Sequence, residues 1–256
     1  MRLSSKLLSI PAFVFLSLLP TSQAATDDSF VVNGVRIHYM VEGKGQPVVL
    51  IHGLNSSAAH NWQLPGIISL LSKDYQVIAV DMPGHGKSDK PLAEEAYGAQ
   101  MVEYVIRLLD HLKIKKAHII GYSMGGMIAV KLMVKYPERA LSGLVCGMGW
   151  LREGSAMQKV LERIPAGRRS QTPAVCARSL GKLAVSEEEI KSIRVPVEVL
   201  VGDRDPVRRL FVAPLAEVRR DWKVVEIRDA GHLSCVVRQQ FKDEIKNWLD
   251  KNSGRN

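Results

Sequence analysis

Short apolar segments alternate along this chain with amphipathic ones. The apolar segments are bounded by Gly, Pro or Asp, and they lie at residues 48–51, 75–80, 117–120, 141–145, 195–201 and 224–227. Such brief, almost wholly apolar runs are typical of strands that are buried on both faces of a sheet. The pattern therefore predicts a series of buried strands separated by longer connections.

The connections carry apolar residues at intervals of three and four, which is the spacing of one helix face. The clearest set is Val102, Val105, Ile106, Leu109 and Leu112, and a second set near the end of the chain is Phe241, Ile245, Trp248 and Leu249. Strands that alternate with helices favour a mostly parallel sheet flanked by helices on both sides. We therefore predict an α/β fold.

Two segments depart from this alternation. In residues 31–39, Asn33-Gly34 separates two apolar-rich stretches, which predicts a tight antiparallel hairpin at the start of the domain. Residues 151–194 instead form a long break between two predicted strands. This break contains helix-start signals at Thr172-Pro173 and at Ser186 with Glu189. We interpret it as a short helical lid within a single domain that spans residues 25–256.

The first two dozen residues have a different character. Arg2 and Lys6 precede an apolar run at residues 7–19, and small residues follow at 22–25. This order predicts a secretory signal peptide at residues 1–24. The run is shorter than the roughly 20 residues needed to cross a bilayer. We therefore expect an exported protein, periplasmic or secreted, with no stable membrane span after cleavage.

Composition narrows the classes of partner. The 256 residues are 46% hydrophobic with a net charge of +9, but the basic residues occur in scattered clusters without interleaved aromatic residues. We interpret these clusters as solvated surface, and expect no nucleic-acid partner. Cys146, Cys176 and Cys235 are too few for a disulfide scaffold, and no spacing suggests a metal or another cofactor. The sequence leaves the oligomeric state open.

A candidate nucleophile lies in the segment Gly121-Tyr122-Ser123-Met124-Gly125, between a predicted strand and a predicted helix. A sharp strand-to-helix turn exposes the serine and needs small neighbours. The start of the helix also offers free N–H groups where an oxyanion would form. We therefore predict that Ser123 is a nucleophile.

A serine hydroxyl needs a base, and the base needs an orienting acid. His232 follows the last predicted strand, where α/β sheets assemble their sites. The other histidines, among them His60 and His85, lie in strands, helices or glycine-containing loops and are interpreted as structural. Both Asp203 and Asp205 follow the preceding strand in the chain order Ser, Asp, His, so the residues alone leave the acid open between them.

The chain resembles the α/β-hydrolase superfamily over nearly its whole length after the leader. The resemblance rests on Asn33-Gly34, residues 49–53, 81–88 and 136–139, the Ser123 segment, residues 202–205 and Gly231-His232. It implies the α/β-hydrolase fold, with Asp205 as the acid and backbone N–H groups of Leu54 and Met124 forming the oxyanion hole. A serine at position 123 is unlike the dehalogenase and epoxide hydrolase branches, which carry an aspartate there.

These residues favour a serine hydrolase that cleaves carboxylic esters through an acyl-enzyme, with a small ester-like molecule as its substrate. An apolar pocket is expected around Leu54, Trp62, Met124, Met148 and Trp150, which would suit small or medium acyl groups. The same triad would also serve an acyltransferase, perhydrolase, amidase or C–C bond hydrolase. A ligand-binding or sensor protein of the same fold is a third hypothesis.

Overall fold

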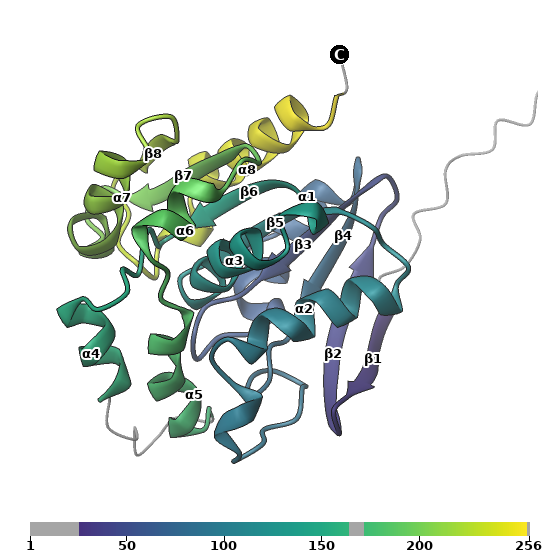
Figure 1. The fold of residues 1–256 in the computed structure, drawn as a ribbon. Helices are drawn as coiled ribbons and strands as arrows, with labels where there is room; N and C mark the ends of the chain where they lie inside the picture. Colours follow the sequence, from purple (N-terminus) through teal and green to yellow (C-terminus); the bar gives the residue numbers. More distant parts are fainter. Residues whose placement is uncertain (1–25, 164–171, 255–256) are drawn as a thin grey trace, which may run out of the picture.

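The computed structural model describes residues 26–163 and 172–254, and these form one eight-stranded sheet (Figure 1). The strands are β1 (Thr26–Val32), β2 (Val35–Glu42), β3 (Gln46–Ile51), β4 (Tyr75–Val80), β5 (Ala117–Tyr122), β6 (Ala140–Cys146), β7 (Val197–Gly202) and β8 (Lys223–Ile227). Their order is β1-β2-β4-β3-β5-β6-β7-β8. Only the pairings of β2 are antiparallel, which confirms the predicted mostly parallel sheet. The predicted signal peptide, residues 1–24, lies outside the described residues.

The hairpin at the edge of the sheet turns at the predicted dipeptide. Asn33 and Gly34 have φ angles of 51° and 74°, the left-handed values that a two-residue hairpin turn requires. β1 and β2 then pair in register from Val32 and Val35 to Thr26 and Val41. The antiparallel start of the domain is therefore confirmed.

Helices cover both faces of the sheet, and each face has its own apolar core (Figure 1). One face is covered by α2 (Gln100–His111), α3 (Met124–Lys135) and α7 (Ala213–Val218). The opposite face is covered by α1 (Ile67–Leu71) and α8 (Gln239–Asn252). β5 and β7 are buried at every position between these layers. Two-sided burial explains why the sequences of these central strands are continuous apolar runs, whereas β8 at the edge of the sheet has only one buried residue.

The segment between β6 and β7 contains three short helices, α4 (Ala156–Glu162), α5 (Ala174–Ser179) and α6 (Glu187–Ser192). The capping box predicted for the last of these is present, because Ser186 Oγ accepts from Glu189 N at 3.1 Å and Glu189 Oε2 accepts from Ser186 N at 2.8 Å. The predicted start of α5 was one residue too early. Pro173 has ψ of 137°, so it is the N-cap and the helix begins at Ala174.

The base of this lid segment is closed by contacts between its two ends. Trp150 Nε1 donates to the Val185 carbonyl at 2.9 Å, and Val185 N donates to the Leu151 carbonyl at 3.1 Å. Lys131 of α3 also forms an ion pair with Glu189 of α6 at 3.2 Å. The two ends of this segment are therefore joined to each other, and the segment is attached to α3 near its return to the sheet. In the described part of the chain, no helix has the length and apolar character needed to cross a bilayer.

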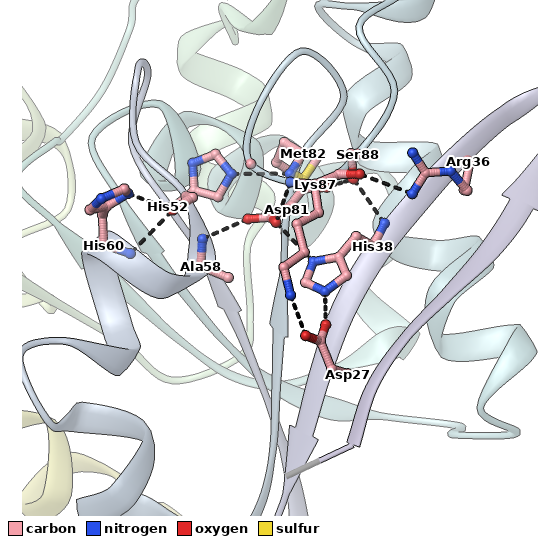
Figure 2. A network of polar contacts seen from close by, with 12 residues as sticks. Asp27, Arg36, His38, His52, Ala58, His60, Asp81, Met82, Lys87 and Ser88 are labelled. Atoms are coloured by element: carbon pink, nitrogen blue, oxygen red, sulfur yellow. Dashed lines mark hydrogen bonds and ion pairs between the residues drawn. The ribbon is translucent and has the colours of Figure 1, made fainter.

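A buried aspartate at the end of β4 connects three parts of the fold (Figure 2). The carboxylate of Asp81 accepts hydrogen bonds from Ala58 N at 2.8 Å, Lys87 N at 2.9 Å and His38 Nδ1 at 2.8 Å. Ser88 Oγ donates to the Asp81 carbonyl at 2.6 Å and accepts from His38 N at 2.8 Å. Residues 81–88 thus form a fixed turn against β2.

The histidines beside this turn also have structural contacts. His52 Nε2 accepts from Met82 N at 3.0 Å, and the His52 and His85 rings lie 4.9 Å apart. Burial lowers the pKa of His85 to about 3, so this imidazole is neutral in the folded protein. Nearby, the Gly86 backbone leaves no space for a side chain, because a β-carbon there would lie 2.1 Å from the Asp81 carboxylate.

Replacing Asp81 should destabilise the fold. Asp81→Ala leaves the buried N–H of Ala58 and the partly buried N–H of Lys87 without their acceptor, which should lower the free energy of unfolding by about 3 kcal/mol. Urea denaturation followed by circular dichroism measures this change. Glu94→Ala removes only an exposed ion pair with Lys182 and should leave the midpoint nearly unchanged. Equal midpoints for the two variants would show that the Asp81 contacts are not needed for stability.

Candidate active site

A strained turn connects β5 to α3 at Ser123. The serine has φ of 54° and ψ of −113°, a conformation that non-glycine residues rarely adopt and that concentrates at functional sites. Its neighbours are packed against backbone on both sides. A β-carbon on Gly121 would lie 2.0 Å from the Gly125 carbonyl oxygen, and one on Gly125 would lie 2.1 Å from that of Ile51. The glycines therefore permit the turn by their lack of a side chain.

The turn brings Ser123 to His232, which lies 109 positions later in the chain. The Ser123 hydroxyl donates to His232 Nε2 across 2.9 Å, and His232 Nδ1 donates to Asp205 Oδ2 across 2.7 Å. The Asp205 side chain is fully buried, whereas the imidazole is 32% exposed. β5, β7 and β8 each end beside this site, so parallel pairing carries three distant residues to one edge of the sheet.

The structure separates the two aspartates that the sequence left open. Asp205 contacts the imidazole, and its Oδ1 accepts from Val207 N at 2.9 Å. Asp203 instead accepts from Asp229 N at 3.0 Å and Ala230 N at 3.1 Å. These backbone N–H groups hold the pKa of the Asp203 carboxyl below its usual value. Asp203 therefore supports the loop before His232, a role that the sequence analysis did not foresee.

The two predicted oxyanion donors lie on either side of the serine. Met124 is the first residue of α3, where helix N–H groups have no acceptor within the helix. On the other side, a β-carbon on Gly53 would lie 3.3 Å from the Ser123 β-carbon, so the loop that carries Leu54 passes next to the serine. Gly53 N donates to Asn61 Oδ1 at 3.0 Å, which fixes this loop. The catalytic roles of Leu54 and Met124 stay predictions.

A small cavity of about 180 Å³ opens beside Ser123 and His232. It is lined by Gly53, Leu54, Ser56, His60, Asn61, Tyr122, Ser123, His232, Leu233 and Val236. Hydrogen-bonding side chains thus share the lining with apolar ones, and none of these residues is a lysine or arginine. The polar lining includes His60, which is exposed on the turn η1 (Ala59–Gln63) and which the sequence analysis interpreted as structural.

The predicted apolar lining was mostly wrong. Leu54 does line the cavity, but Trp62, Met124, Met148 and Trp150 are each at most 3% exposed and belong to the two cores. Trp62 packs beneath the sheet with α1 and α8, and the Trp150 indole is used to close the lid base. Proximity in sequence to the motifs could not reveal which way these side chains point.

The cysteines are free thiols in the described residues, and all three are buried. Burial raises the pKa of the Cys176 and Cys235 thiols to about 12. They are therefore protonated core residues rather than nucleophiles. Within residues 26–163 and 172–254, no group of three or more His, Cys, Asp or Glu side chains is placed to hold a metal ion.

Comparison with known proteins places this geometry in a family. A family model described as the alpha/beta hydrolase fold matches residues 46–188. The chain is 36% identical over 214 residues to a 2-hydroxy-6-oxo-6-phenylhexa-2,4-dienoate hydrolase from Comamonas testosteroni, a match that covers 83% of this chain and 67% of the relative. It is also 40% identical over 121 residues to the dihydrolipoyllysine-residue acetyltransferase component of the acetoin cleaving system of Cupriavidus necator.

The second match covers 46% of this chain and only 31% of that relative. Among solved structures, a meta-cleavage product hydrolase from Pseudomonas fluorescens is similar with a TM-score of 0.69 and 26% identity, covering 88% of this chain and 96% of that one. The fold, the extent of the family match and the likeness to a hydrolase over 83% of this chain agree. The chain belongs to the α/β-hydrolase family.

Proposed function

We propose that this protein is a serine hydrolase that cleaves carboxylic esters through an acyl-enzyme on Ser123. The observation that carries the proposal is the pair of hydrogen bonds on one imidazole, 2.9 Å to the Ser123 hydroxyl and 2.7 Å to the buried Asp205 carboxylate. This is the arrangement in which a hydroxyl becomes nucleophilic at neutral pH, because the base that takes its proton is held in the correct tautomer.

Each group has a role in the proposed reaction. His232 Nε2 accepts the proton of Ser123 as Oγ attacks the carbonyl carbon of the ester. The negatively charged oxygen that forms accepts hydrogen bonds from the backbone N–H groups of Leu54 and Met124. The protonated imidazole then gives its proton to the departing alcohol. Water activated by the same imidazole attacks the acyl-enzyme and releases the acid. Asp205 stabilises the positive imidazole in both halves of the reaction.

The cavity supports a small substrate. Its volume of about 180 Å³ is below the roughly 300–1,000 Å³ of pockets that hold drug-sized ligands. Leu233 and Val236 offer apolar contacts, whereas Asn61 and His60 offer polar ones. We therefore propose short acyl esters rather than long-chain lipids as the substrate class.

The likeness to the Comamonas hydrolase favours one second candidate. The substrate in that relative's name carries a ketone and a carboxylate but no ester, so its hydrolysis must break a carbon–carbon bond. Such a substrate brings a carboxylate into the site. The described cavity lining supplies no lysine or arginine to pair with that charge, which favours a neutral ester. Acyl transfer to an acceptor other than water would use the same acyl-enzyme.

Removal of the nucleophile should abolish turnover. Ser123→Ala is expected to lower kcat for p-nitrophenyl acetate by at least about 10⁴-fold, because no other group takes its place in the acyl-enzyme. Steady-state assays across p-nitrophenyl esters of two to twelve carbons measure this and the chain-length preference together. Ser192→Ala, which changes an exposed hydroxyl on α6, is the control and should match the parent.

Parent-level hydrolysis by the Ser123→Ala variant would refute the proposed nucleophile. A parent enzyme that leaves every ester intact but cleaves a 2-hydroxy-6-oxo-dienoate would refute the ester assignment and favour the second candidate. Product analysis by mass spectrometry with and without an added alcohol distinguishes hydrolysis from acyl transfer.

The two aspartates should differ sharply in effect. Asp205→Asn removes the charge that orients and stabilises the imidazole, and kcat should fall by about 10⁴-fold. Asp203→Asn keeps an oxygen that can accept from the loop backbone, so the loss should be well below about 100-fold. Parallel kcat measurements with thermal melts test this difference. A larger loss for Asp203→Asn than for Asp205→Asn would overturn the assignment of the acid.

A further inference from the structure

Tyr122, the residue immediately before the nucleophile, reaches across to His232. Its hydroxyl donates a hydrogen bond to the backbone carbonyl of His232, and its ring centroid lies 5.6 Å from that of the imidazole. The side chain is almost completely buried, yet the residue forms part of the cavity wall. One residue therefore contacts the base of the predicted triad and is covalently joined to its nucleophile.

Tyr122 is itself held rigidly in place. It is the last residue of β5, and its ring packs edge-on against Phe241 of α8 at 5.9 Å. On another side it lies against Gly147, where a β-carbon would be 2.8 Å from the tyrosine ring. Burial raises the pKa of the phenol well above its usual value, so the hydroxyl remains a hydrogen-bond donor. Because β5, α8 and Gly147 fix this side chain, it can hold the His232 backbone in one position.

The loop that carries His232 is exposed at its tip, which is closed by a turn in which Cys235 N donates to the Gly231 carbonyl at 3.2 Å. Leu233 is 89% exposed, and the imidazole itself is 32% exposed. Asp203 holds the start of the loop through Asp229 and Ala230, and Ser234 Oγ accepts from Gly231 N within the loop. The tyrosine contact differs from these because it acts on the backbone of the histidine and comes from the nucleophile turn.

We propose that Tyr122 is a positioning residue that sets the distance between nucleophile and base. Its hydroxyl fixes the His232 backbone, while its own backbone leads directly into Ser123. One rigid side chain thereby holds both reacting groups in position, in place of two independent loops. This inference rests on the proposed roles of Ser123 and His232, but not on esters being the substrate.

Tyr122→Phe tests the proposal because it removes the hydroxyl and keeps the ring against Phe241 and the cavity. We expect kcat to fall about tenfold, the size expected when one aligning hydrogen bond is lost. KM should stay within about twofold of the parent value, since the ring still lines the cavity. The second-order rate of inactivation by a fluorophosphonate should fall by a similar factor, because this reaction needs the serine–histidine pair but no ester.

A spectroscopic measurement distinguishes positioning from simple packing. The proton shared by His232 Nδ1 and Asp205 should give a downfield proton resonance in the parent enzyme. In Tyr122→Phe, greater motion of the imidazole should broaden this resonance or raise its exchange rate with water. Ser123→Ala, in which the resonance should remain, shows that the signal does not depend on the nucleophile.

Tyr97→Phe is the matched control. Tyr97 is also a buried tyrosine whose hydroxyl donates to a backbone carbonyl, that of Pro91 at 2.7 Å, but it does not line the cavity. Both variants lose one buried hydrogen bond and should lose similar thermal stability. Only Tyr122→Phe should lose kcat and fluorophosphonate reactivity.

The inference is overturned if Tyr122→Phe keeps the parent kcat, inactivation rate and resonance while losing stability like Tyr97→Phe. Failure of the underlying assignment has a different result, because Ser123→Ala would then react with the fluorophosphonate as fast as the parent. Failure of the ester proposal alone would leave the fluorophosphonate and resonance results intact.

Discussion

The site depends on a close approach of backbones at the turn between β5 and α3. Gly121 and Gly125 meet there with almost no space between them, and Gly125 also lies against the end of β3. This close contact accompanies the strained, positive-φ backbone of Ser123, whose hydroxyl lies beside His232. The buried sheet keeps the turn in place, since β5 is fully buried between two helical layers. Strain at Ser123 is thus sustained by packing elsewhere in the fold.

The imidazole is placed by a different means. Its loop follows β8 at the periphery of the sheet, and side chains from neighbouring strand ends hold it. Asp205 bonds the ring, Asp203 bonds the loop backbone, and Tyr122 bonds the histidine carbonyl. The parallel order of β5, β6, β7 and β8 is what makes these contacts possible, because it gathers the strand ends at one edge. The sheet topology brings the side chains close together, and a few hydrogen bonds orient the imidazole.

Much of this could be predicted from the sequence, for identifiable reasons. Two-sided burial makes strands continuous apolar runs, so the parallel strands were visible, and Asn33-Gly34 marked the hairpin through its turn geometry. Ser123 and His232 could be predicted as site residues because each follows a predicted strand, whereas the residues alone left Asp203 and Asp205 open and only the family resemblance pointed to Asp205. The direction in which a side chain points could not be predicted from the sequence. Trp62 and Trp150 lie near the motifs but face the core, whereas His60 faces the cavity, and only the packed fold decides such orientations.

The closed base of the lid has a consequence for how this scaffold can change. Trp150 and Val185 join the two ends of the insertion to each other, and Ser123 N is bonded independently to the Cys146 carbonyl at the end of β6. The insertion is therefore joined to itself at its two ends, and its described residues, 151–163 and 172–194, make none of the hydrogen bonds of Ser123, Asp205 and His232. The segment between those two contacts can therefore vary in length and polarity without disturbing the backbone bond that holds Ser123.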